Sequence, residues 1–274
     1  MKKSLKNFMC IIGLIPLIAQ AGSDVKLDKV SVNTRDVEVL QRGAKHFVNY
    51  CMACHSLKYM SYNRLGKDLA LTKEQVFNDL MFSWDDKKQL SDYMTLAMTP
   101  DQAKVFFGSQ PPDLSVITRA RGVDWLYTYL RAFYRDPQRP FGMNNLVLPE
   151  VNMPHVFAEL QGIQEARVDV QMEGPGATKP QSFETVTAAR AFVSTLSKDI
   201  KVKTHIMGFK LAEPGRLSSA EYDQTVRELV SFLAHVSDPN KNERHRRGFW
   251  IIFYLLIFTV LAYLLKKEYW RDVH

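Results

Sequence analysis

Apolar residues recur at helical spacing in three stretches of the chain, and they predict helices over residues 34–50, 123–133 and 219–236. The first of these helices runs directly into a short segment that contains two cysteines. The last carries a capping-box pattern, in which Ser218 precedes the helix and Glu221 lies three residues further on. These amphipathic segments predict a mainly α domain.

Patterning is weaker between these helices. Prolines interrupt residues 98–114 and 136–154, which predicts loops with short helical pieces in the first range and irregular structure in the second. Apolar and polar residues alternate over residues 201–211, which predicts one strand of a small hairpin, and residues 174–179 predict a turn. The expected fold is therefore a mainly α domain with long loops and a small β element.

The N-terminal apolar run predicts a cleaved signal peptide. Residues 1–21 carry lysines near the start, continue with the apolar segment Phe8–Ile18 and finish with Ala19-Gln20-Ala21, a small-x-small cleavage pattern. About a dozen apolar residues are too few to cross ~30 Å of hydrocarbon, which disfavours a permanent membrane helix. We therefore expect cleavage after Ala21 and export of the domain that follows.

The C-terminal apolar run predicts a transmembrane anchor. Residues 248–265 carry no charge and make about 27 Å of helix at 1.5 Å per residue, with aromatic residues flanking them. Since residues 22–240 are expected to be exported, the basic juxtamembrane segment 241–247 lies on the periplasmic side and residues 266–274 form a cytoplasmic tail. The sequence thus predicts a single-pass protein of a bacterial inner membrane, with its folded domain in the periplasm.

Composition and charge fit an ordinary globular domain between these ends. Hydrophobic residues make up 46% of the chain and charged residues 24%, which are typical proportions for globular proteins. The net charge of +7 comes from the two ends, because residues 1–21 contribute +3 and residues 241–274 contribute +4. A nucleic-acid-binding domain needs clustered basic residues on its folded surface, so no nucleic acid partner is expected.

The clearest chemical motif is Cys51-x-x-Cys54-His55. The third cysteine, Cys10, lies in the expected signal peptide, so the mature chain has no disulfide framework. Two cysteines at this spacing on a helical turn can each add to one vinyl group of a haem, and the next residue is then placed under the iron. The motif predicts one haem c, attached covalently through two thioethers, with His55 as the proximal ligand.

Two other kinds of site use similar cysteines. A thioredoxin-type dithiol uses CxxC at a strand-to-helix junction of a βαβ unit, and this sequence shows no βαβ alternation. A structural zinc site needs four ligands, and no second CxxC or histidine pair supplies the missing ones. Haem attachment is therefore favoured over both.

The sixth iron ligand decides what such a haem does. A methionine thioether closes the site, favours ferrous iron and makes an electron carrier. Met153 fits this role best because Pro149 and Pro154 stiffen its segment, while Met143 and Met207 remain alternatives. Ordinary packing in helical faces is expected for Met81, Met94 and Met98.

The two haem propionates also need partners, since carboxylates in an apolar crevice are costly unless they are paired. Arg119 and Arg121 follow a proline-containing loop and are candidates for this pairing. The alternative is that both arginines are solvated on the surface of a helix.

Five segments, in this order, resemble the cytochrome c1 family, the membrane-anchored c-type cytochromes of the ubiquinol–cytochrome c reductase (bc1) complex. They are RGAKHFVNYCMACHSLKYMSYNRL, QPPDLSVITRARG, VNMPHVFAELQG, LSSAEYDQTVRELVSFLAHVSDP and RHRRGFW. The resemblance covers nearly the whole mature chain. One departure is Asn152, where bacterial members of the family often have glycine.

The resemblance implies roles for residues and for partners. The residues that it assigns to the haem are Cys51 and Cys54 as thioethers, His55 and Met153 as axial ligands, Arg121 as a propionate partner, and Pro111 and Pro112 as the lining of the crevice. It implies an electron relay from a Rieske iron–sulfur protein to a cytochrome c, in a complex with cytochrome b. The alternatives are a tethered cytochrome that serves another oxidase or donor enzyme, and a thiol–disulfide oxidoreductase. Local acids at Asp85-Asp86 could form a docking patch, although a solvated loop explains them equally.

Overall fold

The computed structural model describes residues 25–81, 89–96, 98–174, 178–197 and 199–271. Its helices are Val37–Tyr50 (α2), Tyr62–Asp68 (α3), Lys73–Asp79 (α4), Pro100–Phe107 (α5), Ile117–Ala120 (α6), Val123–Arg131 (α7), Ala158–Gln161 (α8), Val186–Ser194 (α9), Ser219–Ser237 (α10) and Lys241–Tyr269 (α11). Its strands are Leu57–Ser61 (β1), Tyr93–Met94 (β2), Phe133–Arg135 (β3), Met143–Asn145 (β4), Gly162–Glu173 (β5), Gln181–Phe183 (β6) and Lys201–Pro214 (β7).

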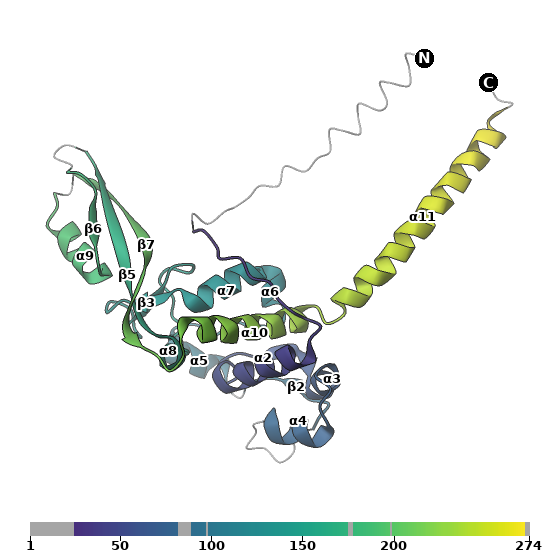
Figure 1. Ribbon diagram of the computed structural model, residues 1–274, viewed down its shortest axis with the longest axis horizontal. Coiled ribbons are helices and arrows are strands. Elements are labelled where there is room, and N and C mark those ends of the chain that lie inside the picture. Colours follow the sequence, from purple (N-terminus) through teal and green to yellow (C-terminus); the bar gives the residue numbers. More distant parts are fainter. Residues whose placement is uncertain (1–24, 82–88, 97, 175–177, 198, 272–274) are drawn as a thin grey trace.

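Three parts of the molecule are distinct in Figure 1. A helical lobe is formed by residues 25–161 and 215–240, an arm by residues 162–214, and the long helix α11 extends away from the lobe. The expected fold class, mainly α with small β elements and one C-terminal apolar helix, is confirmed.

The three helices expected from hydrophobic periodicity are present. α2 begins where the carboxylate of Asp36 accepts hydrogen bonds from two backbone N–H groups of the first turn. α10 begins with the expected capping box, in which Ser218 and Glu221 each satisfy the other's backbone N–H. α7 ends at Arg131, two residues earlier than expected, because strand β3 begins at Phe133.

The helical lobe is built around α10. Helix α2 packs along one side of α10, and α6 and α7 pack along the other (Figure 1). Gly43 permits the first contact, since a Cβ atom there would lie 2.3 Å from the carbonyl oxygen of Glu228 and 2.6 Å from Cβ of Phe232. The fully buried rings of Phe47 and Phe232 meet in the same interface, with centroids 5.8 Å apart. Helices from opposite ends of the chain therefore close the core of the lobe.

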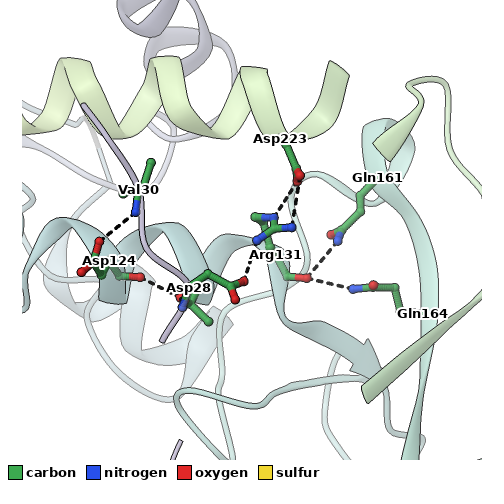
Figure 2. Close-up of polar contacts among 8 residues, drawn as sticks. Asp28, Val30, Asp124, Arg131, Gln161, Gln164 and Asp223 are labelled. Atoms are coloured by element: carbon green, nitrogen blue, oxygen red, sulfur yellow. Dashed lines mark hydrogen bonds and ion pairs between the residues drawn. The ribbon is translucent and has the colours of Figure 1, made fainter. Parts of the chain in front are cut away.

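Arg131, at the end of α7, joins several segments of the molecule (Figure 2). Its Nη1 donates to Asp28 of the N-terminal segment and its Nε donates to Asp223 of α10, each at 2.6 Å. Its carbonyl oxygen accepts hydrogen bonds from the side-chain amides of Gln161 and Gln164, each at 2.9 Å. One residue thus ties the N-terminal segment and α10 to the base of the arm.

The arm is a three-stranded antiparallel sheet with strand order β6-β5-β7, and α9 covers one face. Alternate residues of β5 are buried on that face, namely Ala166, Val168, Val170 and Met172. Together with residues of α9 they form a hydrophobic core separate from that of the lobe. The strand expected over residues 201–211 is present and longer than expected, because β7 runs from Lys201 to Pro214 and pairs along the whole of β5.

The arm leaves and rejoins the lobe at one narrow neck. Gly162 pairs with Pro214, and a Cβ atom on Gly162 would lie 2.2 Å from the carbonyl oxygen of Glu213. The φ of Gly162 is +89°, a conformation that favours glycine. Across the neck, Arg190 of α9 forms an ion pair with the fully buried carboxylate of Asp136, which follows β3.

Helix α11 contains the expected anchor, residues 248–265, but begins before it. The basic juxtamembrane segment is helical as well, and Arg244 pairs with Asp238 at 2.6 Å across the helix start. By length and composition, Glu243–Tyr269 is a candidate membrane span, and its apolar side chains are exposed all round.

One expectation about the irregular regions is confirmed and another needs correction. Residues 98–114 contain a short helical piece, as expected: α5 forms because Thr99 caps it and Pro100 occupies its first turn, where a missing N–H costs nothing. The expectation that Met81, Met94 and Met98 pack in helical faces was wrong. Met94 is in strand β2, and the other two lie outside helices. Some expectations fall on residues that lie outside the described ones. These are the expected signal peptide, Asp85-Asp86, residues 175–177 of the expected turn and the last three residues of the tail.

Candidate functional site

The Cys51–His55 motif opens onto a cavity of about 380 Å³ in the helical lobe. Cofactor pockets commonly measure about 300–1,000 Å³. All the residues expected at the haem line this cavity: Cys51, Cys54, His55, Pro111, Pro112, Arg121 and Met153. Other lining residues carried no sign of a cofactor site in the sequence, among them Phe107, Trp125, Tyr129, Leu229 and Leu233.

His55 is positioned by the end of α2 and by a proline-containing strap, residues 111–114. Cys51 is the C-cap of α2, and the backbone N–H of His55 donates to the Cys51 carbonyl at 2.8 Å. The Nδ1 of the buried imidazole lies 2.7 Å from the carbonyl oxygen of Pro112. Because a carbonyl only accepts, Nδ1 carries the proton and Nε2 is left as the metal-binding nitrogen. Burial lowers the pKa of His55, which favours the neutral form that binds a metal.

The strap owes its place to hydrogen bonds on both sides of the proline pair. The Leu114 N–H donates to the Ser56 carbonyl at 2.9 Å, and the carboxylate of Asp113 accepts from the Lys58 N–H at 2.9 Å. These contacts hold the segment so that the Pro112 carbonyl meets the imidazole. Pro112 therefore orients the histidine, and both prolines line the crevice.

No disulfide joins the two motif cysteines. Burial raises the pKa of Cys51 to about 12 and also raises the pKa of Cys54. A catalytic dithiol works through a lowered thiol pKa, which is the opposite shift. Among the residues that the structure describes, no group of three or more His, Cys, Asp or Glu side chains is arranged to hold a metal ion. Neither the dithiol nor the zinc alternative gains support from this geometry.

The loop that carries Met153 is held from outside by polar side chains. Arg139 donates from Nη2 to the Asn152 side chain at 2.9 Å and to the carbonyl of Glu150. The Asn144 side-chain oxygen accepts from the Glu150 N–H at 2.8 Å. Glu150 has a φ of +61°, which this pair of contacts stabilises. The unusual Asn152 therefore has a defined partner, and the loop is fixed in place.

A tyrosine hydroxyl meets the sulfur of Met153 at the cavity wall. The Tyr129 hydroxyl donates to Met153 Sδ, with 3.2 Å between oxygen and sulfur. Burial raises the pKa of Tyr129, so its hydroxyl keeps its proton. Only the helical periodicity of α7 pointed to Tyr129 in the sequence, and that signal indicates core packing rather than a site.

The structure separates Met153 from the other candidates for the sixth ligand. Met143 is buried in β4 without lining the cavity, and Met207 lies on the arm strand β7 with its side chain 66% exposed. His155 stacks on Phe133 with centroids 4.8 Å apart and does not line the cavity either. Burial lowers its pKa to about 4. Among the described residues, Met153 is the methionine at the cavity wall.

Arg121 lies at the solvent-exposed rim of the cavity. It caps the end of α6, and its guanidinium carbon lies 5.2 Å from the centroid of the Trp125 ring. Trp125 also lines the cavity, so the contact holds the cation beside the opening. Arg119, its neighbour in the sequence motif, does not line the cavity.

The donors around this cavity fit a haem c. An imidazole nitrogen and a thioether sulfur are the axial ligands of c-type cytochromes, and two thiols lie beside the imidazole. Aromatic and aliphatic side chains form much of the remaining wall, and a guanidinium at the rim suits the propionates.

Comparison with known proteins agrees with this chemistry. The chain matches the model of the Cytochrome C1 family over residues 28–161 and 215–273, which leaves out the arm. It is 42% identical to a cytochrome c1 of Allochromatium vinosum over the full length of both chains. It is 37% identical, over 99% of its length and all of the relative, to a Nitrosomonas europaea protein named ammonia monooxygenase gamma subunit. A weaker similarity, 26% identity over 87% of the chain, covers 34% of a Bradyrhizobium diazoefficiens protein named cytochrome b/c1.

Proposed function

The chain belongs to the cytochrome c1 family, the haem-carrying electron-transfer subunits of the bc1 complex, and we propose that it relays one electron from a Rieske iron–sulfur protein to a cytochrome c. The observation that carries this proposal is that both motif cysteines, His55 and Met153 line one cavity. Haem c supplies the one-electron chemistry when it is bound there. The relay needs no acid, base or nucleophile from this chain.

The residues around the cavity have distinct roles in this proposal. Cys51 and Cys54 hold the single haem through two thioethers. His55 would hold the iron through Nε2, because Nδ1 is engaged by the strap, and Met153 would hold it through its sulfur, from a loop fixed by Arg139. Arg121 pairs with a propionate at the rim. Because His55 and Met153 would both hold the iron, a bound haem c would favour electron transfer over the binding of small molecules.

The chain is proposed to work as a single-pass protein of a bacterial inner membrane. Residues 1–21 are removed after export, residues 22–240 lie in the periplasm, α11 spans the bilayer and residues 266–274 stay in the cytoplasm. The exposed apolar surface of α11 supports a lipid environment. Cytochrome b is the expected membrane partner, and the relative named cytochrome b/c1 supports this pairing.

A second candidate function is favoured by one relative. The protein named ammonia monooxygenase gamma subunit suggests a tethered cytochrome that serves a different membrane enzyme. Affinity purification of the tagged chain from detergent-solubilised membranes separates the two. Recovery of cytochrome b and a Rieske protein supports the bc1 assignment, and recovery of another oxidase without them supports the alternative.

The axial ligation is tested by Met153→Leu in the full-length protein, expressed with a working haem-attachment machinery. The variant is expected to keep covalent haem on a denaturing gel. It should lose the near-infrared charge-transfer band of the ferric state, and its reduction potential should fall strongly, because a thioether favours ferrous iron. Met143→Leu, a buried methionine outside the cavity, is the matched control. Loss of the band in Met207→Leu and its survival in Met153→Leu contradict the assignment.

A further inference from the structure

The hydroxyl of Tyr129 donates a hydrogen bond to the sulfur of Met153, the expected sixth ligand of the iron. The Tyr129 oxygen lies 3.2 Å from Met153 Sδ, and both residues line the cavity. A thioether sulfur has two lone pairs, so it can bind iron with one and accept a hydrogen bond with the other. The contact is therefore compatible with metal binding by the same sulfur.

The phenol is held firmly in this position. The Trp125 ring stacks on Tyr129 with centroids 5.0 Å apart and planes within 8°, and the Phe133 ring meets it edge-on at 5.3 Å. The Tyr129 carbonyl accepts a hydrogen bond from the Asn145 side-chain amide at 2.7 Å. The side chain is only 7% exposed. Stacking and backbone contacts therefore place the hydroxyl without help from Met153.

The position of Met153 is likewise set by contacts other than the one with Tyr129. Its loop is held by Arg139 and Asn144 through the backbone of Glu150 and the side chain of Asn152. Two separately supported groups thus meet at one hydrogen bond. A hydroxyl aimed at a ligand atom is the kind of outer contact that tunes a metal centre.

We propose that Tyr129 is a positioning residue that sets the reduction potential, by donating its hydrogen bond to the Met153 sulfur while that sulfur binds the haem iron. This inference rests on the proposed axial role of Met153. The hydrogen bond withdraws electron density from the sulfur, and ferric iron loses more stabilisation from this than ferrous iron does. Tyr129 therefore favours the reduced state.

The test is Tyr129→Phe in the full-length holoprotein, since phenylalanine keeps the ring and its stacking. Haem content and the near-infrared band are expected to persist, because Met153 still binds. The ratio of reduced to oxidised haem, measured at a fixed ambient potential, should fall by up to about tenfold, which is ~59 mV for a one-electron couple. Tyr127→Phe makes the same chemical change two residues away, outside the cavity, and should leave the ratio unchanged.

A second substitution tests the direction of the effect and does not depend on the stability of Tyr129→Phe. Incorporation of 3-fluorotyrosine at position 129 keeps the shape and strengthens the donor, so the ratio should rise. If both changes at position 129 give the same ratio as Tyr127→Phe, or if Tyr129→Phe abolishes the near-infrared band, the proposal is wrong. Failure of the underlying axial assignment is seen separately, as survival of the band in Met153→Leu.

Discussion

The helical lobe and the arm bury their apolar residues in different ways. In the lobe, α2 and α10 come from opposite ends of the chain and meet beside the cavity. In the arm, β5, β6, α9 and β7 follow one another and enclose a core made largely of their own residues. The family match covers the lobe and omits the arm. The cofactor site therefore depends on long-range packing, and the arm is a locally folded addition to it.

The two regions are joined at the neck and along β3. Arg135 of β3 pairs with Glu165 and Glu213 of the arm, and Arg190 of the arm pairs with Asp136. The rings of Tyr134 and Phe209 also stack across this junction, with centroids 6.1 Å apart. Because each region has its own core, a substitution in one core should have little effect on the stability of the other region.

The largest effect is expected from Phe47→Ala in the lobe. Removing a fully buried ring from the α2–α10 interface should cost about 3–5 kcal/mol of unfolding free energy. Because α2 carries the haem motif, the loss should appear in thermal unfolding followed by haem absorbance. The matched arm change, Val170→Ala, should leave that transition unchanged and speed amide hydrogen exchange in β5. An equal shift of the haem transition in both variants contradicts the separation of the two cores.

An intermediate effect on the unfolding free energy is expected from Asp136, and it should depend on pH. Burial alone would raise the pKa of Asp136, but hydrogen bonds from Arg190, Asn144 and the Gln138 N–H lower it overall. A carboxylate with a lowered folded pKa stabilises the protein above its unfolded value of about 3.9, and that contribution is lost as pH falls through the folded pKa. Asp136→Asn should cost about 1.5–3 kcal/mol at neutral pH and flatten the dependence of stability on acid, as measured by urea unfolding at several pH values. An unchanged acid profile in the variant contradicts this role.

The smallest spectral effect is expected from removing the arm. Deleting residues 163–213 joins Gly162 to Pro214, which already pair at the neck. The shortened protein should keep its covalent haem, near-infrared band and reduction potential, since the described cavity-lining residues all lie outside the arm. Absorbance spectroscopy and a redox titration measure this directly. A lost band means that the arm supports the Met153 loop, through Asp136 and Asn144.

The sequence located the residues whose chemistry needs a fixed local spacing. The Cys51–His55 motif and the three amphipathic helices are of this kind. The features it missed depend on partners far away in the chain, such as the ion pair of Asp136 with Arg190 or the contact of Tyr129 with Met153.

The packing of α2 against α10 has a consequence for biogenesis, because the two helices lie far apart in the sequence. If the chain is exported as proposed, Cys51 and Cys54 would cross the membrane before Leu229 and Leu233, which complete the wall around them. Contacts between such distant segments form late, because the intervening chain must be ordered first. In that case the haem would be attached to an open motif, before α10 packs against α2.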